Sequence, residues 1–90
     1  MTFFQEKVYQ RVKKIPKGQV KTYSDIAHRI GGGAYRAVGT ALNKNRDPKV
    51  PCHRVIKATG EVGGYRWGEN KKITLLKKEG IIIKDGKVTS

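Results

Sequence analysis

The spacing of apolar residues predicts an amphipathic helix at the start of the chain. Between residues 3 and 15, apolar side chains recur every three or four positions, which places them on one face of a helix. This face consists of Phe4, Val8, Val12 and Ile15. Thr2 and Gln5 fit a capping box at the start of this helix, and Pro16 ends it.

Two more short helices are predicted on either side of a glycine run. Thr22 is suited to cap the first of them, because Asp25 follows three residues later. The apolar side of this helix consists of Tyr23, Ile26, Ala27 and Ile30. Gly31 to Gly33 break it, and a helix over residues 34–44 follows, with the inner face Ala34, Ala37, Val38, Ala41 and Leu42. Two short helices across a tight turn are typical of a helix-turn-helix.

The second half of the chain is predicted to hold a long irregular segment, one helix and a hairpin. Glycines and prolines interrupt residues 45–68, where the apolar residues form only short islands. A fourth helix is expected over residues 70–78, with Ile73, Leu75 and Leu76 as its apolar side chains. The dipeptide Asp85-Gly86 favours a two-residue hairpin turn in the tail. The predicted fold is therefore mostly α with minor β.

Composition narrows the class of protein. The 90 residues suit one small domain, and 20 Lys or Arg against 7 Asp or Glu give a net charge of +13. Such a charge favours a polyanionic partner, with a lysine-rich solvated surface as the plain alternative. No apolar run is long enough to span a membrane, and the N-terminus lacks the pattern of a signal peptide. We therefore expect a cytoplasmic protein, associated with the nucleoid, or a nuclear one if the source is eukaryotic.

The single cysteine is the first candidate for chemistry. Cys52 stands next to His53, and a nearby imidazole or cation favours the nucleophilic thiolate. On an extended segment the two side chains point apart, so we expect proton transfer through a bridging water, with Glu79 as a candidate partner of the imidazole. The alternative is that Cys52 is a buried small apolar residue and that His53 is a satisfied core histidine. With only one cysteine, a disulfide relay is disfavoured.

The helix over residues 34–44 is the candidate DNA reader. It combines outward polar side chains with small residues, and small residues let a helix approach a narrow groove or pack closely against a neighbouring helix. Arg36, one turn into the helix, either contacts DNA or is an ordinary surface arginine. The residues of this helix expected to contact DNA are Tyr35, Arg36, Ala37, Gly39 and Thr40, and the family resemblance given below adds Tyr23.

Several sequence motifs together resemble one known family, the O6-alkylguanine-DNA alkyltransferases. The resemblance covers residues 3–80 and is carried above all by Arg36-Ala37-Val38-Gly39 and by Pro51-Cys52-His53-Arg54-Val55. Further matching stretches are residues 18–27, 63–68 and 75–80. The resemblance implies a winged-helix-like helix-turn-helix domain with an active-site loop, in which the recognition helix lies in the minor groove.

The resemblance also implies roles for individual residues. Cys52 would accept the alkyl group from guanine O6, with His53 as the water-mediated base and Glu79 as the acid that holds the imidazole. Arg36 would fill the gap left by the flipped guanine, and Tyr23 would help to rotate the nucleotide and to protonate the leaving base. The hinge and the guanine pocket would involve Asn45, Val55 and Tyr65. The implied partner is double-stranded DNA containing an alkylated guanine, bound by a monomer without metal or cofactor.

The length leaves alternatives open. Residues 1–90 are expected to form a single catalytic domain, without the N-terminal domain that most family members carry. Alkyltransferase-like proteins are similarly short, but they replace the cysteine and only bind damaged DNA. A damage-binding sensor is therefore the alternative function, and a plain helix-turn-helix regulator is the third.

Overall fold

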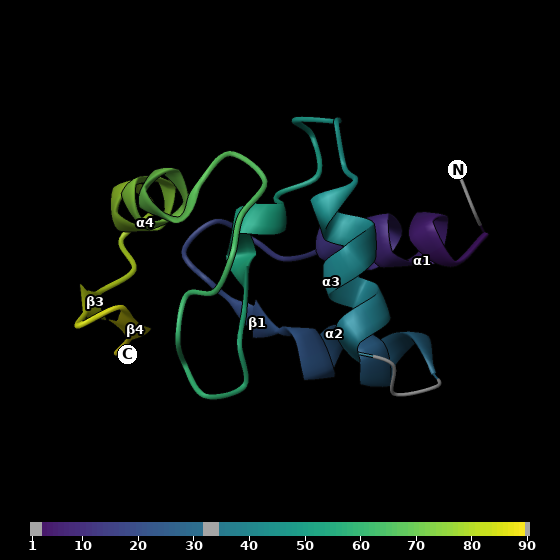
Figure 1. The fold of residues 1–90 in the computed structure, drawn as a ribbon, viewed down its shortest axis with the longest axis horizontal. Coiled ribbons are helices and arrows are strands. Elements are labelled where there is room, and N and C mark those ends of the chain that lie inside the picture. Colours follow the sequence, from purple (N-terminus) through teal and green to yellow (C-terminus); the bar gives the residue numbers. More distant parts are fainter. Residues whose placement is uncertain (1–2, 32–34, 90) are drawn as a thin grey trace.

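The protein, seen in a computed structural model, has three helices at one end and a fourth helix with a hairpin at the other (Figure 1). The structure describes residues 3–31 and 35–89. The helices are α1 (Phe3–Val12), α2 (Tyr23–Ile30), α3 (Tyr35–Asn43) and α4 (Glu69–Lys78). The strands are β1 (Lys21–Thr22), β2 (Val55–Ile56), β3 (Ile83–Lys84) and β4 (Lys87–Val88). This order confirms the mostly α fold with minor β.

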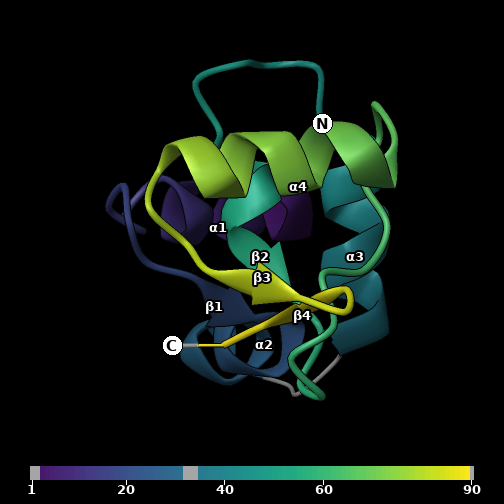
Figure 2. The same cartoon turned by 90° about the vertical axis from the view of Figure 1, so that its left-hand side faces the viewer.

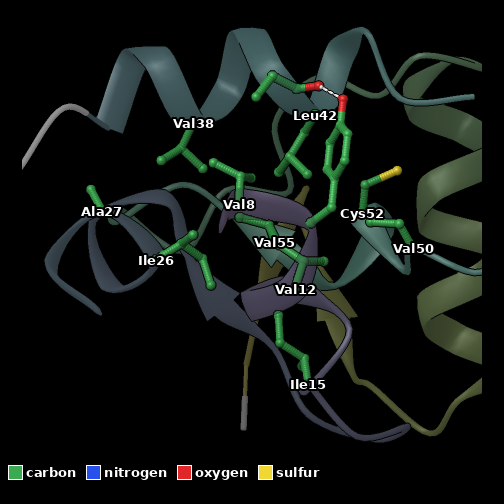
Figure 3. Packing of buried hydrophobic residues seen from close by; sticks show 12 residues of the cluster. Val8, Val12, Ile15, Ile26, Ala27, Val38, Leu42, Val50, Cys52 and Val55 are labelled. Carbon is green, nitrogen blue, oxygen red and sulfur yellow. Dashed lines mark hydrogen bonds between the residues drawn. The ribbon is translucent and has the colours of Figure 1, made fainter. Parts of the chain in front are cut away.

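The first three helices share the main hydrophobic core. Val8 and Val12 of α1 are fully buried against Ile26 of α2 and Val38 of α3 (Figure 3). The helix predicted over residues 3–15 ends earlier, at Val12, because Pro16 disfavours helical backbone in the residue before it. Short-range bonds of the 3₁₀ type replace the last turn, and Ile15 still reaches the core at 3% exposure. The capping box predicted at Thr2 lies outside the described residues.

The second and third helices form the predicted helix-turn-helix. At the start of α2, the Thr22 Oγ1 atom accepts from the Asp25 amide and Asp25 Oδ2 accepts from the Thr22 amide, both at 3.0 Å. This reciprocal pair is the predicted capping box. Gly31 ends α2 with a φ of 89°, a backbone conformation that favours glycine. The remaining glycines of the turn and Ala34, the predicted start of the next helix, lie outside the described residues.

A parallel pair of short strands joins the helix-turn-helix to the segment that carries the cysteine. Strand β1 pairs with β2 so that Lys21 lies opposite Val55 and Thr22 opposite Ile56. The sequence predicted residues 45–68 as irregular and missed both β2 and a 3₁₀ turn over Cys52–Arg54. Two-residue strands carry no periodicity of their own, and this pairing depends on contacts 34 residues apart in the sequence.

The fourth helix and the hairpin enclose a second, smaller core. Leu76 of α4, Ile56 and Val62 form this cluster, and the β3–β4 hairpin covers it from the side (Figure 2). The predicted hairpin turn is confirmed at Asp85 and Gly86, which both have positive φ, as a two-residue turn of this type requires. Because α4 is held by this core, the residue that follows it, Glu79, is placed beside the 3₁₀ turn.

Within residues 3–31 and 35–89, no helix is both long enough and apolar enough to cross a bilayer. In the same ranges, no three or more His, Cys, Asp or Glu side chains gather as they would around a metal ion.

Candidate functional site

Cys52 begins the 3₁₀ turn that follows Pro51. The residue is only 5% exposed, and in Figure 3 its sulfur points away from the aliphatic side chains of the core. The expectation that Cys52 and His53 lie on an extended segment was wrong, because Cys52–Arg54 closes a tight turn in which the Val55 amide bonds to the Cys52 carbonyl. Among the described residues, no hydrogen bond joins the thiol to the His53 ring. The two groups are therefore neighbours that are not hydrogen-bonded to each other.

The surroundings of the thiol act in opposite directions on its pKa. Burial raises the pKa of Cys52 above its usual value, and this is the largest effect. The Asn45 side chain opposes it, since its Nδ2 atom lies 3.8 Å from Sγ, and Tyr65 also donates toward the sulfur. Burial and the adjacent thiol together raise the pKa of Tyr65 to about 12. The resting site therefore favours a neutral thiol that needs a base to react.

His53, Arg54 and Glu79 form a connected polar cluster behind the thiol. His53 Nε2 lies 3.0 Å from Glu79 Oε2, the acid that the resemblance implies as the partner of the imidazole. Arg54 bonds to both carboxylate oxygens, through Nε at 2.9 Å and Nη2 at 2.7 Å, and its Nη1 donates to the carbonyl of Ile15 at 2.8 Å. Arg54 thus fixes Glu79 between the end of the first helix and the 3₁₀ turn.

The charge on Glu79 settles how the imidazole is oriented. Hydrogen bonds from Arg54, followed by those from His53, lower the pKa of Glu79 to about 2. An ionised carboxylate only accepts, so the proton of a neutral His53 ring resides on Nε2. Nδ1 is then left with its lone pair, which is the form of histidine that can take a proton.

Lys72 is a buried cation that sequence patterning did not single out. It is 0% exposed, and its Nζ donates to the Gly64 carbonyl at 3.1 Å and to the Tyr23 hydroxyl at 3.5 Å. Burial lowers the pKa of Lys72 to about 8. Lysine is rarely buried, so composition alone points to the surface. The available signal was its spacing, because Lys72 lies one helical turn before Leu76 on the inward face of α4.

Tyr23 lies at the centre of the site. The Lys72 ammonium is 5.7 Å from the centre of its ring, and burial raises the pKa of its hydroxyl. Two glycines lie next to the same side chain. A Cβ at Gly39 would be 4.0 Å from the ring, and one at Gly63 would be 3.7 Å from the hydroxyl and 3.3 Å from Lys57. Small residues at these points let α3 and the loop approach Tyr23 closely.

A pocket of about 530 Å³ opens onto Cys52 between α3 and the loop 63–68. It brings together the sequence-predicted residues Tyr23, Arg36, Gly39, Thr40, Cys52 and Tyr65. Tyr35 is exposed and lines a neighbouring hollow, also beside Tyr23, and Ala37 is half-buried. Asn45 is buried against the thiol, and Val55 has its side chain in the core and not in the pocket.

The charges around the pocket have one sign. Arg36, Lys44 and Arg66 line it, and no Asp or Glu does so among the described residues. Within residues 3–31 and 35–89, the ion pairs are those of Glu79 with His53 and Arg54, so none of these three cations is neutralised. A recessed thiol with a cationic rim suits a substrate that carries negative charge around an electrophilic group.

This fold and site define a helix-turn-helix domain with a buried cysteine, and the comparison with known families agrees. The family described as 6-O-methylguanine DNA methyltransferase, DNA binding domain, matches residues 3–81. The chain belongs to this family. A methylated-DNA–protein-cysteine methyltransferase of Mycobacterium leprae is 48% identical over 80 residues, which cover 87% of this chain and 48% of the relative. The chain thus spans about half the length of the curated relatives it matches.

Solved structures show the same similarity. The Mycobacterium tuberculosis OGT in complex with DNA has 46% identity and a TM-score of 0.84, with coverage of 88% of this chain and 50% of that one. S. pombe Atl1, solved in complex with damaged DNA containing O6-carboxymethylguanine, has 33% identity and a TM-score of 0.86. In that comparison, 99% of this chain and 89% of the other are covered.

Proposed function

We propose that this chain repairs DNA by transferring an alkyl group from guanine O6 to Cys52. The observation that carries the proposal is the placement of a buried thiol at the floor of a pocket whose other wall is the recognition helix α3. The polar cluster of His53 and Glu79 stands behind that thiol. The family, and relatives named methylated-DNA–protein-cysteine methyltransferase, support the same reading.

The transfer is a displacement at carbon. The sulfur of Cys52 forms a bond to the alkyl carbon while the bond from that carbon to guanine O6 breaks. The thiol proton passes to His53 Nδ1 through a water, and guanine leaves after it gains a proton, so that charge is conserved. Tyr23 is the proposed donor to the leaving base, since it lines the pocket and its hydroxyl receives a hydrogen bond from Lys72. Glu79 holds the imidazole and stabilises it when it is charged.

Access to the alkyl group requires the nucleotide to leave the helix. Extrusion of a base takes a few kcal/mol of stacking and pairing energy, which inserted side chains and phosphate contacts offset. In this proposal α3 enters the minor groove, Arg36 fills the gap left by the guanine, and Tyr65 lines the base pocket. Arg36 suits this task because it is exposed and lines the pocket mouth.

The reaction is stoichiometric in this proposal. The product is a thioether on Cys52, which water does not readily cleave, and the sequence holds no second cysteine to displace it. Each monomer would therefore act once on double-stranded DNA.

The DNA product provides the test. A duplex with one O6-methylguanine inside a restriction site is resistant to the nuclease until the methyl group is removed. Incubation with the wild type should restore cleavage in proportion to the protein added, whereas Cys52→Ala should bind the duplex and leave it resistant. Resistance that persists with excess wild-type protein would rule out transfer by this chain.

The second candidate is a sensor that binds alkylated guanine without transfer. The observation in its favour is that the chain shares its fold with S. pombe Atl1, solved in complex with damaged DNA containing O6-carboxymethylguanine, at a TM-score of 0.86 and 33% identity. The presence of Cys52 favours transfer. If the chain is a sensor, the wild type and Cys52→Ala should bind the modified duplex equally well in the nuclease assay, and neither protein should restore cleavage.

A further inference from the structure

Arg66 links the two walls of the Cys52 pocket. It lies in the loop 63–68, and its Nη1 donates at 2.9 Å to the carbonyl of Asn43, the last residue of α3. Its guanidinium also lies 5.8 Å from the ring centre of Trp67. Because Arg66 and Asn43 both line the pocket, this bond runs from the loop wall to the recognition helix.

The loop that carries Arg66 is tied to the reactive centre by aromatic contacts. The rings of Tyr65 and Trp67 lie 5.2 Å apart, and the Tyr65 ring meets the His53 ring edge-on at 6.5 Å. Gly64, next in the loop, accepts from the buried Lys72. The backbone on either side of Arg66 is therefore anchored. Its own side chain is exposed, and apart from its contact with the Trp67 ring the described residues give it one partner, the neutral carbonyl of Asn43.

That carbonyl is a weak partner for a guanidinium. A charge-assisted bond from arginine to a phosphate is about twice as strong as a bond between neutral groups, and the planar fork can engage two phosphate oxygens at once. An extruded nucleotide has a phosphate on each side, and it would pass between α3 and the loop 63–68 to reach Cys52.

We propose that Arg66 acts as a strap, a side chain that joins the two walls of the pocket in the free protein, and that it binds a phosphate when a nucleotide occupies the pocket. As the alkylated nucleotide enters, Arg66 releases the Asn43 carbonyl and binds a phosphate that flanks the extruded nucleotide. This inference rests on the proposed recognition of alkylated guanine in DNA. It assigns to Arg66 a positioning role that is separate from the gap-filling role of Arg36.

The strap makes one phosphate contact conditional on extrusion. Arg66 then contributes to binding of a duplex that contains O6-methylguanine and contributes little to binding of the same duplex without it. An ordinary surface cation would contribute equally to both. The salt dependence of binding separates these cases, because each phosphate contact adds about 0.9 to the slope of log affinity against log salt concentration.

The experiment measures this slope for the two duplexes in a Cys52→Ala background, so that no transfer occurs. Arg66→Ala should lower the slope by about one phosphate contact on the O6-methylguanine duplex and leave it unchanged on the unmodified duplex. Arg66→Lys should keep the slope, because the charge is retained. Arg46→Ala is the matched control: Arg46 is also exposed, contacts a backbone carbonyl near the end of α3 and lies outside the pocket. This substitution should change the slope by the same amount on the two duplexes.

Equal slope changes on both duplexes, or no change on either, would overturn the role of Arg66. This readout does not depend on transfer, so it remains decisive even if the nuclease assay shows that the chain is only a sensor. Conversely, restored cleavage together with an unchanged slope would leave the proposed function standing without the strap.

Discussion

The Nε2 atom of His53 lies 3.0 Å from the Oε2 atom of Glu79, a residue 26 positions further along the chain. The contact spans two elements, since His53 is on the 3₁₀ turn and Glu79 follows α4. It orients the imidazole and fixes which nitrogen carries the proton. Arg54 shares the same carboxylate, so one acidic side chain organises both basic neighbours of Cys52.

Substitution of Glu79 tests this arrangement. Glu79→Gln keeps the shape of the side chain but removes the charge that favours the protonated imidazole, so transfer to Cys52 should slow by roughly 100-fold. Stability should fall by roughly 1–3 kcal/mol, because Arg54 loses a charged partner. Single-turnover kinetics and urea unfolding measure the two effects. Glu69→Gln, at an exposed position in the first turn of α4, is the control: it should leave the transfer rate unchanged and lower stability by less than about 1 kcal/mol. An unchanged transfer rate in Glu79→Gln would remove Glu79 from the mechanism.

The low pKa of Glu79 also predicts how stability varies with acid. The folded pKa is about 2, below the usual 4.5. Between these values the unfolded chain binds more protons than the folded chain, so this contribution is complete above pH 4.5 and is lost as the pH falls toward 2. Thermal unfolding from pH 6 to pH 2 should therefore show a steeper loss for the wild type than for Glu79→Gln. Parallel curves would contradict the ion pairs of Glu79.

The buried lysine also makes stability rise with pH, but in the alkaline range. The pKa of Lys72 falls from 10.5 to about 8 on folding, so between these values the unfolded chain holds the extra proton and the contribution of Lys72 to stability rises with pH. Lys72→Met removes this titration. Both proteins carry Cys52→Ala to remove the thiol titration. Between pH 8 and about pH 10, the free energy of unfolding of the protein with Lys72 should rise by roughly 2 kcal/mol relative to that of Lys72→Met. Urea unfolding at several pH values measures the difference. A difference in the free energy of unfolding that does not change with pH would indicate that Lys72 is exposed to solvent.

The packing of α3 can be tested at Tyr9, a buried residue that does not itself line the pocket. The Tyr9 hydroxyl donates to the Ala41 carbonyl at 2.6 Å in the interior, which ties the first helix to the last turn of α3 (Figure 3). Tyr9→Phe should lower the free energy of unfolding by about 1 kcal/mol, since the ring stays buried and the carbonyl still accepts from Lys44. Tyr35→Phe, which is half exposed, should change stability by less than about 0.5 kcal/mol. Equal losses in the two variants would contradict the buried bond.

The parts of the fold that could be predicted depend on local signals. The capping box of Thr22 and Asp25 and the turn at Asp85-Gly86 each involve residues a few positions apart, and the structure contains both. The first helix was predicted too long because its apolar spacing continues to Ile15, while Pro16 ends the helical backbone earlier. Patterning reports which side chains are buried more reliably than where a helix stops.

The missed parts depend on contacts between distant residues. The pairing of Lys21 with Val55 has no signal in either segment, because two residues are too few for a periodic pattern. Likewise, the buried position of Lys72 depends on its contacts with Tyr23 and Gly64, and Gly64 lies in a segment that was predicted to be irregular. The contact of His53 with Glu79 was expected from the chemistry of the residues and their resemblance to a family, and spacing alone did not select Glu79 from the seven acidic residues.

The most direct measurement is the location of the transferred group on the protein. A duplex carrying O6-methylguanine with an isotopically labelled methyl group is mixed with wild-type protein, and the peptides are analysed by tandem mass spectrometry. We predict that the label appears on the peptide containing Cys52, at the sulfur, with at most one methyl group per chain even when DNA is in excess. Label on any other residue, or protein that stays unlabelled although it is fully bound to the duplex, would contradict the central claim.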